Sequence, residues 1–258
     1  MIAFLASVGA AFLDFLAAAG RLVIFAGQAL AAGLTPPYYP RLILRQIVYV
    51  GYFSLPVVGL TALFTGMVLA LQSYTGFARF NAESAIATVV VLSVTRELGP
   101  VIAGLMVAGR VGAAMAAEIG TMRVTDQIDA LTTLSTDPLR YLVLPRLLAG
   151  LVTLPALVLV ADIIGVFGGF LVGTYKLNFN PQTYLTQTEQ YLETMDVVSG
   201  LVKAAVFGFL VSLMGCYHGY HSRGGAEGVG QATTYAVVSA SILILLFNYF
   251  LTQAFFAR

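Results

Sequence analysis

The sequence has no tryptophan, one cysteine and very little charge. Asp, Glu, Lys and Arg make up 10% of its 258 residues, whereas an average soluble domain carries about 25%. The single cysteine, Cys216, excludes a disulfide-stabilised secreted domain, and the net charge of +1 gives no basic surface for nucleic acid. Hydrophobic residues form 59% of the chain, which excludes a disordered protein and an ordinary cytosolic enzyme. These numbers indicate a polytopic membrane protein, in which tyrosine replaces tryptophan as the interface anchor.

Five apolar segments are each long enough to cross a bilayer core about 30 Å thick, which takes roughly 20 residues. They cover approximately residues 47–75, 84–118, 138–175, 195–220 and 229–256. We therefore predict an all-α polytopic membrane protein with a five-span domain over residues 47–258.

Residues 1–46 are predicted to form a separate N-terminal part. The first 30 residues are apolar and rich in alanine, and no Lys or Arg precedes Arg21, so a cleaved signal peptide is not indicated. Their larger side chains fall roughly on one helical face, which predicts an amphipathic helix lying in the membrane interface. A sixth span is the alternative. Pro36-Pro37 ends this helix, and a short basic amphipathic stretch follows over residues 38–46.

The basic residues of the loops predict the orientation of the spans. Eight lie on one side, namely Arg21, Arg41, Arg45, Arg110, Arg123, Arg140, Arg146 and Arg223. Three lie on the other side, namely Arg79, Lys176 and Arg258. We therefore place the N-terminus and the 2–3 and 4–5 loops in the cytoplasm, and the C-terminus outside.

Two loops are predicted to contain short helices. Asn180-Pro181 is typical of an N-cap followed by proline at the first helical position, which predicts an external helix over residues 181–194. Residues 121–135 are predicted to form a cytoplasmic helix, with Val124, Ile128 and Leu131 on one apolar face. Such a face suits the docking of a partner protein, and a helix that merely connects two spans is the alternative.

Four ionisable residues inside the spans are candidates for function, because charge in a bilayer is costly. Arg96 and Glu97 are adjacent and precede Gly99-Pro100, where proline removes a backbone donor. Neighbouring residues on a helix point about 100° apart, so this pair is predicted to reach separate partners or to line a cavity with a freed carbonyl. A buried ion pair that fixes the helix register is the alternative. Lys203 either snorkels outward or faces an anionic headgroup. Asp162 needs a partner, for which Arg96 and Lys203 are the candidates.

Other patterns give weaker signals. Gly165, Gly169 and Gly173 lie on one face and favour close helix packing, either within the chain or between two copies. His218 and His221 are close to Cys216, but no fourth ligand is evident and we predict no metal site. The sequence has no GxxxxGK[ST] motif, so any energy from ATP must come from a separate subunit. No nucleophile and base are placed for catalysis, and we predict no catalytic residue.

A longer set of motifs gives a specific resemblance. The motifs are Arg96-Glu97-Leu98-Gly99-Pro100, Ala108-Gly109-Arg110-Val111-Gly112-Ala113-Ala114, Glu118-Ile119-Gly120-Thr121-Met122 and Val124-Thr125-Asp126-Gln127-Ile128-Asp129-Ala130-Leu131. They resemble the MlaE (YrbE) permease family, and Asp137-Pro138 with Tyr141-Leu142-Val143-Leu144-Pro145-Arg146 extends the match. Asp126 stands where many members have glutamate, which keeps the charge.

The resemblance implies the transmembrane subunit of a bacterial ABC-type transporter that moves phospholipid and maintains outer-membrane asymmetry, in the inner membrane and as a homodimer. It implies a cytoplasmic ATPase (MlaF-like) that binds the ATP, a STAS-domain protein (MlaB-like) and a periplasmic MCE-domain hexamer (MlaD-like). No cofactor is expected in this chain. The ATPase is expected to dock on the helix over residues 121–135. The coupling residues expected there are Glu118, Arg123, Asp126, Ile128, Asp129 and Leu131.

For the lipid itself we expect an apolar wall with polar groups near the headgroup. Arg96 and Lys203 are predicted to face the phosphate, while Glu97 tunes them or contacts the partner ring. The apolar contacts expected are Leu69, Leu71, Tyr74, Leu98 and Ile102. Two alternatives are a proton-coupled secondary transporter that uses Glu97 and Asp162, and a membrane-embedded lipid-modifying enzyme.

Overall fold

The computed structural model describes residues 2–34, 36–80 and 85–256, and over these ranges it contains helices and no strand. The α-helices are α1 (Ile2–Ala32), α2 (Pro40–Gly51), α3 (Leu55–Phe77), α4 (Ile86–Ser93), α5 (Gly99–Val107), α6 (Ala113–Val124), α7 (Gln127–Thr133), α8 (Leu144–Tyr175), α9 (Pro181–Tyr191), α10 (Thr194–Tyr220) and α11 (Gly225–Phe256). Three π-helical turns lie at Val94–Leu98, Ala108–Gly112 and Leu139–Val143. The predicted all-α polytopic membrane fold is confirmed.

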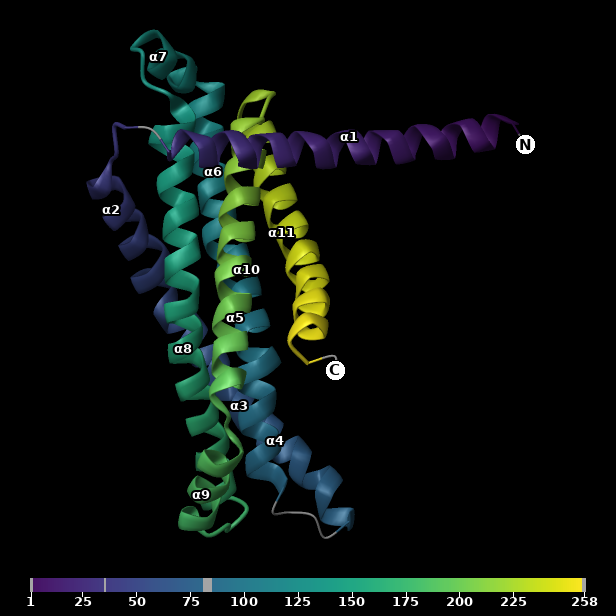
Figure 1. The fold of residues 1–258 in the computed structure, drawn as a ribbon, viewed down its shortest axis with the longest axis vertical. Helices are drawn as coiled ribbons and strands as arrows, with labels where there is room; N and C mark the ends of the chain where they lie inside the picture. The colour runs from purple at the N-terminus through teal and green to yellow at the C-terminus, as the bar shows by residue number, and fades with distance from the viewer. Residues whose placement is uncertain (1, 35, 81–84, 257–258) are drawn as a thin grey trace.

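Five passes run along the bundle: α2 with α3, α4 to α6, α8, α10 and α11 (Figure 1). Six helical segments of the described chain are long and apolar enough to cross a membrane, and the sixth is Phe12–Ala32 of α1. Figure 1 shows α1 running across one end of the bundle instead of along it. This arrangement favours the interfacial helix over a sixth span, and its place in the membrane stays a prediction.

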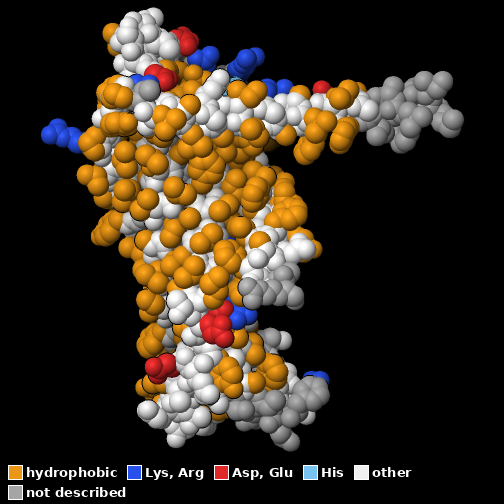
Figure 2. Space-filling model, viewed as in Figure 1, with side chains coloured by type: hydrophobic (Ala, Val, Ile, Leu, Met, Phe, Trp, Pro, Cys, Tyr) orange, Lys and Arg blue, Asp and Glu red, His pale blue; other side chains and the backbone are white. Residues whose placement is uncertain are grey.

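Charge is distributed unevenly along the bundle. Figure 2 shows hydrophobic side chains over most of the visible face, with basic side chains gathered at the end that carries α1 and α7. The opposite end carries α9, which begins as predicted because the Asn180 side chain accepts hydrogen bonds from the backbone of Gln182 and Thr183. The predicted boundary at residue 46 is less sharp, since α2 begins at Pro40 and leads through a short 3₁₀ turn directly into α3.

Helix α8 lies at the centre of the bundle and packs against α2, α3 and α10. Small residues permit this packing, because the backbone of Gly150 in α8 meets that of Gly208 in α10. The predicted glycine face also packs within the chain: Gly165 lies against the carbonyl of Ala62, and Gly173 lies against the ring of Tyr184. The glycines at these positions therefore serve internal contacts.

Gly208→Ala is expected to destabilise the protein. Its added Cβ would collide with the backbone carbonyl of Gly150, and overpacking of this kind costs about 1–3 kcal/mol. The matched control is Gly76→Ala, since a Cβ at Gly76 in α3 would meet no atom within 4 Å and alanine favours the helix. Thermal unfolding in detergent should show a lower midpoint for Gly208→Ala and an unchanged or higher one for Gly76→Ala. Equal midpoints would contradict the close contact.

Candidate functional site

The π-helical turn Val94–Leu98 places two charged residues where three passes meet. Pro100 follows this turn and cannot donate a backbone hydrogen bond, so the carbonyl of Arg96 loses its usual helical partner. The Nζ atom of Lys203, on α10, donates to that carbonyl at 2.9 Å. The carbonyl freed by proline is thus bound by a lysine from another pass.

Glu97 forms the centre of a hydrogen-bonded cluster. Its Oε1 lies 2.7 Å from the Nζ of Lys203 and accepts a bond of 2.9 Å from the hydroxyl of Thr252. Its Oε2 accepts a bond of 2.9 Å from the amide of Asn248. Lys203 also donates to Thr252 at 2.8 Å and is fully buried, with 0% exposure. The cluster therefore joins the second pass to α10 and α11.

Arg96 has a separate partner, as predicted for adjacent helical residues. Its Nε donates to Oδ1 of Asp196 at 2.7 Å, and its guanidinium lies 4.6 Å from the centroid of the Phe256 ring. Asp196 is fixed in the first turn of α10, where its Oδ2 accepts from the backbone of Glu193. The Arg96 side chain is 32% exposed, so part of its guanidinium stays accessible.

Three members of this cluster were missed in the sequence: Asp196, Asn248 and Thr252. A signal was present, because Asn248 follows an uninterrupted apolar run over residues 242–247 of the last span, and Thr252 lies one helical turn further along. Asp196 lies in the first turn of its helix, where an acidic residue is ordinary, so its pairing with Arg96 had no local signal.

The structure corrects the expectation for Lys203. Its ammonium neither snorkels outward nor lies open to a phosphate, because it is fully buried and binds Glu97, Thr252 and the Arg96 carbonyl. Lys203 is therefore placed to position Glu97 and the π-helical turn. Arg96 and Glu97, at 32% and 36% side-chain exposure, are the charged members that a ligand can reach. Their contact with lipid stays a prediction.

Among the described residues, the expected apolar contacts lie in separate places. Leu69 lines a groove of about 380 Å³ near the end of α3. Leu98 and Ile102 line a different, small cavity against α3 and α8. Leu71 and Tyr74 pack on the buried cluster of α3, α4 and α8, and the Tyr74 ring lies 6.0 Å from that of Phe179.

Asp162 has neither of the two partners expected for it. Arg96 binds Asp196 and Lys203 binds Glu97, whereas Oδ1 of Asp162 is buried and has no hydrogen-bond partner in the described part of the chain. Asp162 lines an apolar groove of about 590 Å³, together with Tyr184 of α9. Burial raises the pKa of the Tyr184 hydroxyl to about 12.

The segment over residues 121–135 differs from the single cytoplasmic helix predicted for it. Helix α6 ends at Val124, and Asp126 adopts a left-handed conformation with φ 58°, so α7 starts only at Gln127. Ile128 is 1% exposed and packs with Leu131 on the core of the bundle. The apolar stripe is therefore used inside the chain, and the outer face of α7 is polar.

The expected coupling residues nevertheless lie at one end of the bundle. Arg123 binds Asp129 at 2.7 Å on the surface, and Asp126 is exposed. Glu118 binds Arg146 of α8 at 2.8 Å. The polar side chains of Arg123, Asp126 and Asp129 are accessible to a partner, whereas Ile128 is not.

Comparison with known proteins supports the resemblance. A family model described as "Permease MlaE" matches residues 43–254. The chain is 64% identical over 237 residues to a "Probable ABC transporter permease protein" of Rickettsia bellii, covering 92% of each chain. It is 42% identical over 213 residues to one of Synechocystis, covering 83% of this chain and 81% of the relative. It is 35% identical over 259 residues to the "Intermembrane phospholipid transport system permease protein MlaE" of Haemophilus influenzae, covering 99% and 98%.

Proposed function

Since this chain belongs to the MlaE family of ABC transporter permeases, we propose that it moves phospholipids between the inner and outer membranes of a bacterium. The energy would come from ATP hydrolysed by a separate subunit, and the transport would maintain the lipid asymmetry of the outer membrane. The observation that carries the proposal is the cluster around Arg96 and Glu97, which offers a partly exposed cation and anion among apolar helices.

This cluster has the chemistry that a phospholipid headgroup needs. Arg96 keeps part of its guanidinium accessible, and guanidinium binds phosphate oxygens through directed hydrogen bonds. Lys203 and Asp196 hold Glu97 and Arg96 in place from inside the bundle. The groove at Leu69 offers an apolar wall for acyl chains.

A second copy of the chain would complete the lipid cavity. The apolar residues expected to contact the lipid are spread over separate grooves in one chain. Helix α3 also carries a stripe of large side chains at Leu60, Phe64 and Val68, each more than half exposed. Residues spaced by four lie on one helical face, so this stripe suits packing against a second copy. We therefore propose a homodimer with the lipid between the two copies.

The remaining partners are those that the resemblance to the MlaE family implies, and the predicted orientation says at which end of the bundle each would bind. The cytoplasmic ATPase would dock at the end that carries α7, joined by a small STAS-domain protein, and an MCE-domain hexamer would cover the periplasmic end. The chain is a multi-pass membrane protein, and the inner membrane is the location that these partners require.

Arg96→Ala tests the proposal. Loss of a charge-assisted hydrogen bond to phosphate, worth about 1.5–3 kcal/mol, should reduce lipid transfer by roughly tenfold or more. The assay is ATP-driven transfer of a fluorescent phospholipid from proteoliposomes that contain the chain and its ATPase. The control is Lys176→Ala, which removes an exposed cation at the same end of the bundle but outside the cluster. Unchanged transfer with Arg96→Ala would contradict the assigned role.

One observation favours the secondary transporter as a second candidate. Asp162 is a buried acid with an unpartnered oxygen, whereas Glu97 is bound to Lys203 and is poorly placed to exchange protons. A proton-coupled mechanism would therefore depend on Asp162 alone. It predicts that Asp162→Asn abolishes transport driven by membrane potential in the absence of any ATPase.

A further inference from the structure

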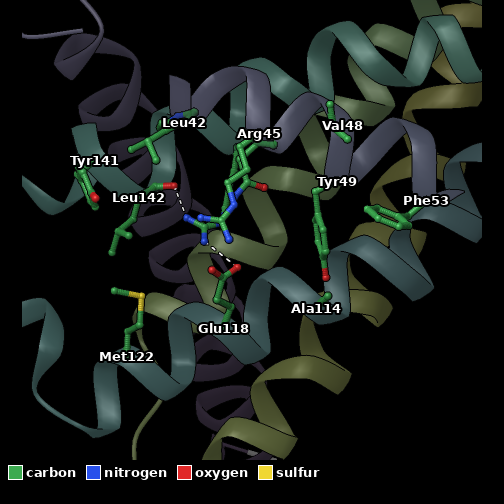
Figure 3. A pocket seen from close by; sticks show the side chains of 13 residues that line it. Leu42, Arg45, Val48, Tyr49, Phe53, Ala114, Glu118, Met122, Tyr141 and Leu142 are labelled. Carbon is green, nitrogen blue, oxygen red and sulfur yellow. Dashed lines mark hydrogen bonds and ion pairs between the residues drawn. The ribbon is translucent and has the colours of Figure 1, made fainter. Parts of the chain in front are cut away.

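A second polar pocket lies far from Arg96, between α2, α6 and α8 at the end of the bundle that carries α1 and α7. Its volume is about 800 Å³, within the range of small-molecule sites. Figure 3 shows Arg45 and Tyr49 extending from α2, and Glu118 from α6, toward the same space. Because Arg96 and Glu118 lie on one continuous pass, 22 residues of helical rise separate the two sites by about 33 Å.

Two residues that line this pocket, Arg146 and Gln46, each have a buried polar atom without a partner in the described part of the chain. The Arg146 side chain is 4% exposed; one terminal nitrogen binds the Leu142 carbonyl at 2.6 Å and the other binds Glu118 at 2.8 Å. Its Nε–H, however, has no acceptor among the residues that the structure describes, and neither does Oε1 of Gln46 have a donor. Each unsatisfied buried group costs about 1–3 kcal/mol. A ligand that offers both an acceptor and a donor would remove this cost.

The charge and the walls of the pocket narrow the class of ligand. Arg45 is exposed and adds a second cation to Arg146. With the negative charge of Glu118, these two arginines give the pocket a net charge of one positive unit. The other walls include apolar side chains such as Leu42 of α2 and Phe53 of the 3₁₀ turn that follows it. An anionic group attached to an apolar tail fits this combination better than a free ion does.

We propose that this pocket binds the headgroup of a glycerophospholipid from the adjacent membrane leaflet. The phosphate accepts hydrogen bonds from Arg45 and from Nε–H of Arg146. A hydroxyl or amine of the headgroup donates to Oε1 of Gln46, and the acyl chains lie along the apolar residues of α2. The site is separate from the proposed transport site and does not depend on transport.

The experiment is photo-crosslinking of the purified full-length chain in nanodiscs, with a photoactivatable phosphatidylglycerol and mapping of the labelled peptides. We expect label on peptides of α2, α6 and α8. An arginine near the membrane surface contributes about 1 kcal/mol to binding an anionic lipid, so Arg45→Gln should reduce the label about fivefold. The matched control is Arg41→Gln, which removes an exposed cation from the same helix outside the pocket. Arg45→Lys should keep most of the label.

Competition identifies the headgroup chemistry. Unlabelled phosphatidylglycerol and phosphatidylethanolamine should displace the label better than phosphatidylcholine, whose headgroup has no hydrogen-bond donor. Gln46→Leu should abolish this preference. Equal loss of label in Arg41→Gln and Arg45→Gln would overturn the proposal, as would label confined to other helices. Displacement by inorganic phosphate alone would also overturn it, because the site would then recognise a free anion.

Discussion

Glu97→Ala is expected to lower the free energy of unfolding by about 3 kcal/mol. The substitution leaves the ammonium of Lys203 fully buried without a counter-ion, and breaking a buried pair costs about 3–5 kcal/mol. The lower end applies because Glu97 itself is 36% exposed. Asn248 and Thr252 would also lose their acceptor. Thermal or denaturant unfolding of the purified chain measures the change.

A double variant separates the structural role of Glu97 from its proposed role with lipid. Glu97→Ala combined with Lys203→Met removes both charges, and stability should largely return because no buried charge is left unpaired. Lipid transfer should stay low. The control is Glu189→Ala, an exposed acid of α9 outside the cluster. Recovery of both stability and transfer in the double variant would make the pair purely structural and contradict a role for Glu97 in lipid binding.

The sequence singled out three charged residues of the cluster, Arg96, Glu97 and Lys203, but not all of their partners. Arg96 and Glu97 were predicted to reach separate partners from the geometry of one helix, and the structure confirms it. Their partners lie about 100 to 155 positions away in sequence. The choice of neighbouring passes depends on the packing of the whole bundle, through contacts such as that of Gly150 with Gly208. No local sequence pattern encodes this choice.

The errors have physical reasons of the same kind. Lys203 was open to two interpretations because a lysine near the end of a span often snorkels. In the structure it instead binds a partner inside the bundle, the carbonyl of Arg96 that Pro100 leaves free. The stripe of Val124, Ile128 and Leu131 was correctly identified as apolar. Its direction could not be predicted, because a face that docks a partner and a face that packs on its own bundle have the same periodicity.

Asp126→Arg combined with Asp129→Arg is expected to abolish copurification of the proposed ATPase while the permease stays folded and keeps the oligomeric state of the unaltered chain. Both side chains are exposed, and the surface pair of Asp129 with Arg123 contributes only about 0–1 kcal/mol. The substitutions therefore reverse the charge of the α7 surface, and their main cost to the fold lies in the left-handed backbone at Asp126. The measurement is affinity purification in mild detergent, with the ATPase quantified per permease and the oligomeric state determined by mass.

The backbone at Asp126 requires a control of its own. Its φ of 58° is left-handed, where Asp and Asn are tolerated and other side chains cost about 1–2 kcal/mol. Asp126→Asn with Asp129→Asn keeps that conformation and removes the charge, so it should weaken ATPase binding less than the arginine variant does. Glu189→Arg, at the opposite end of the bundle, should leave the ATPase bound.

Wild-type amounts of ATPase on the double arginine variant would show that the polar face of α7 is not the docking surface. Since Ile128 and Leu131 already pack on the bundle, coupling would then have to use another surface, such as the exposed Leu134 that follows α7.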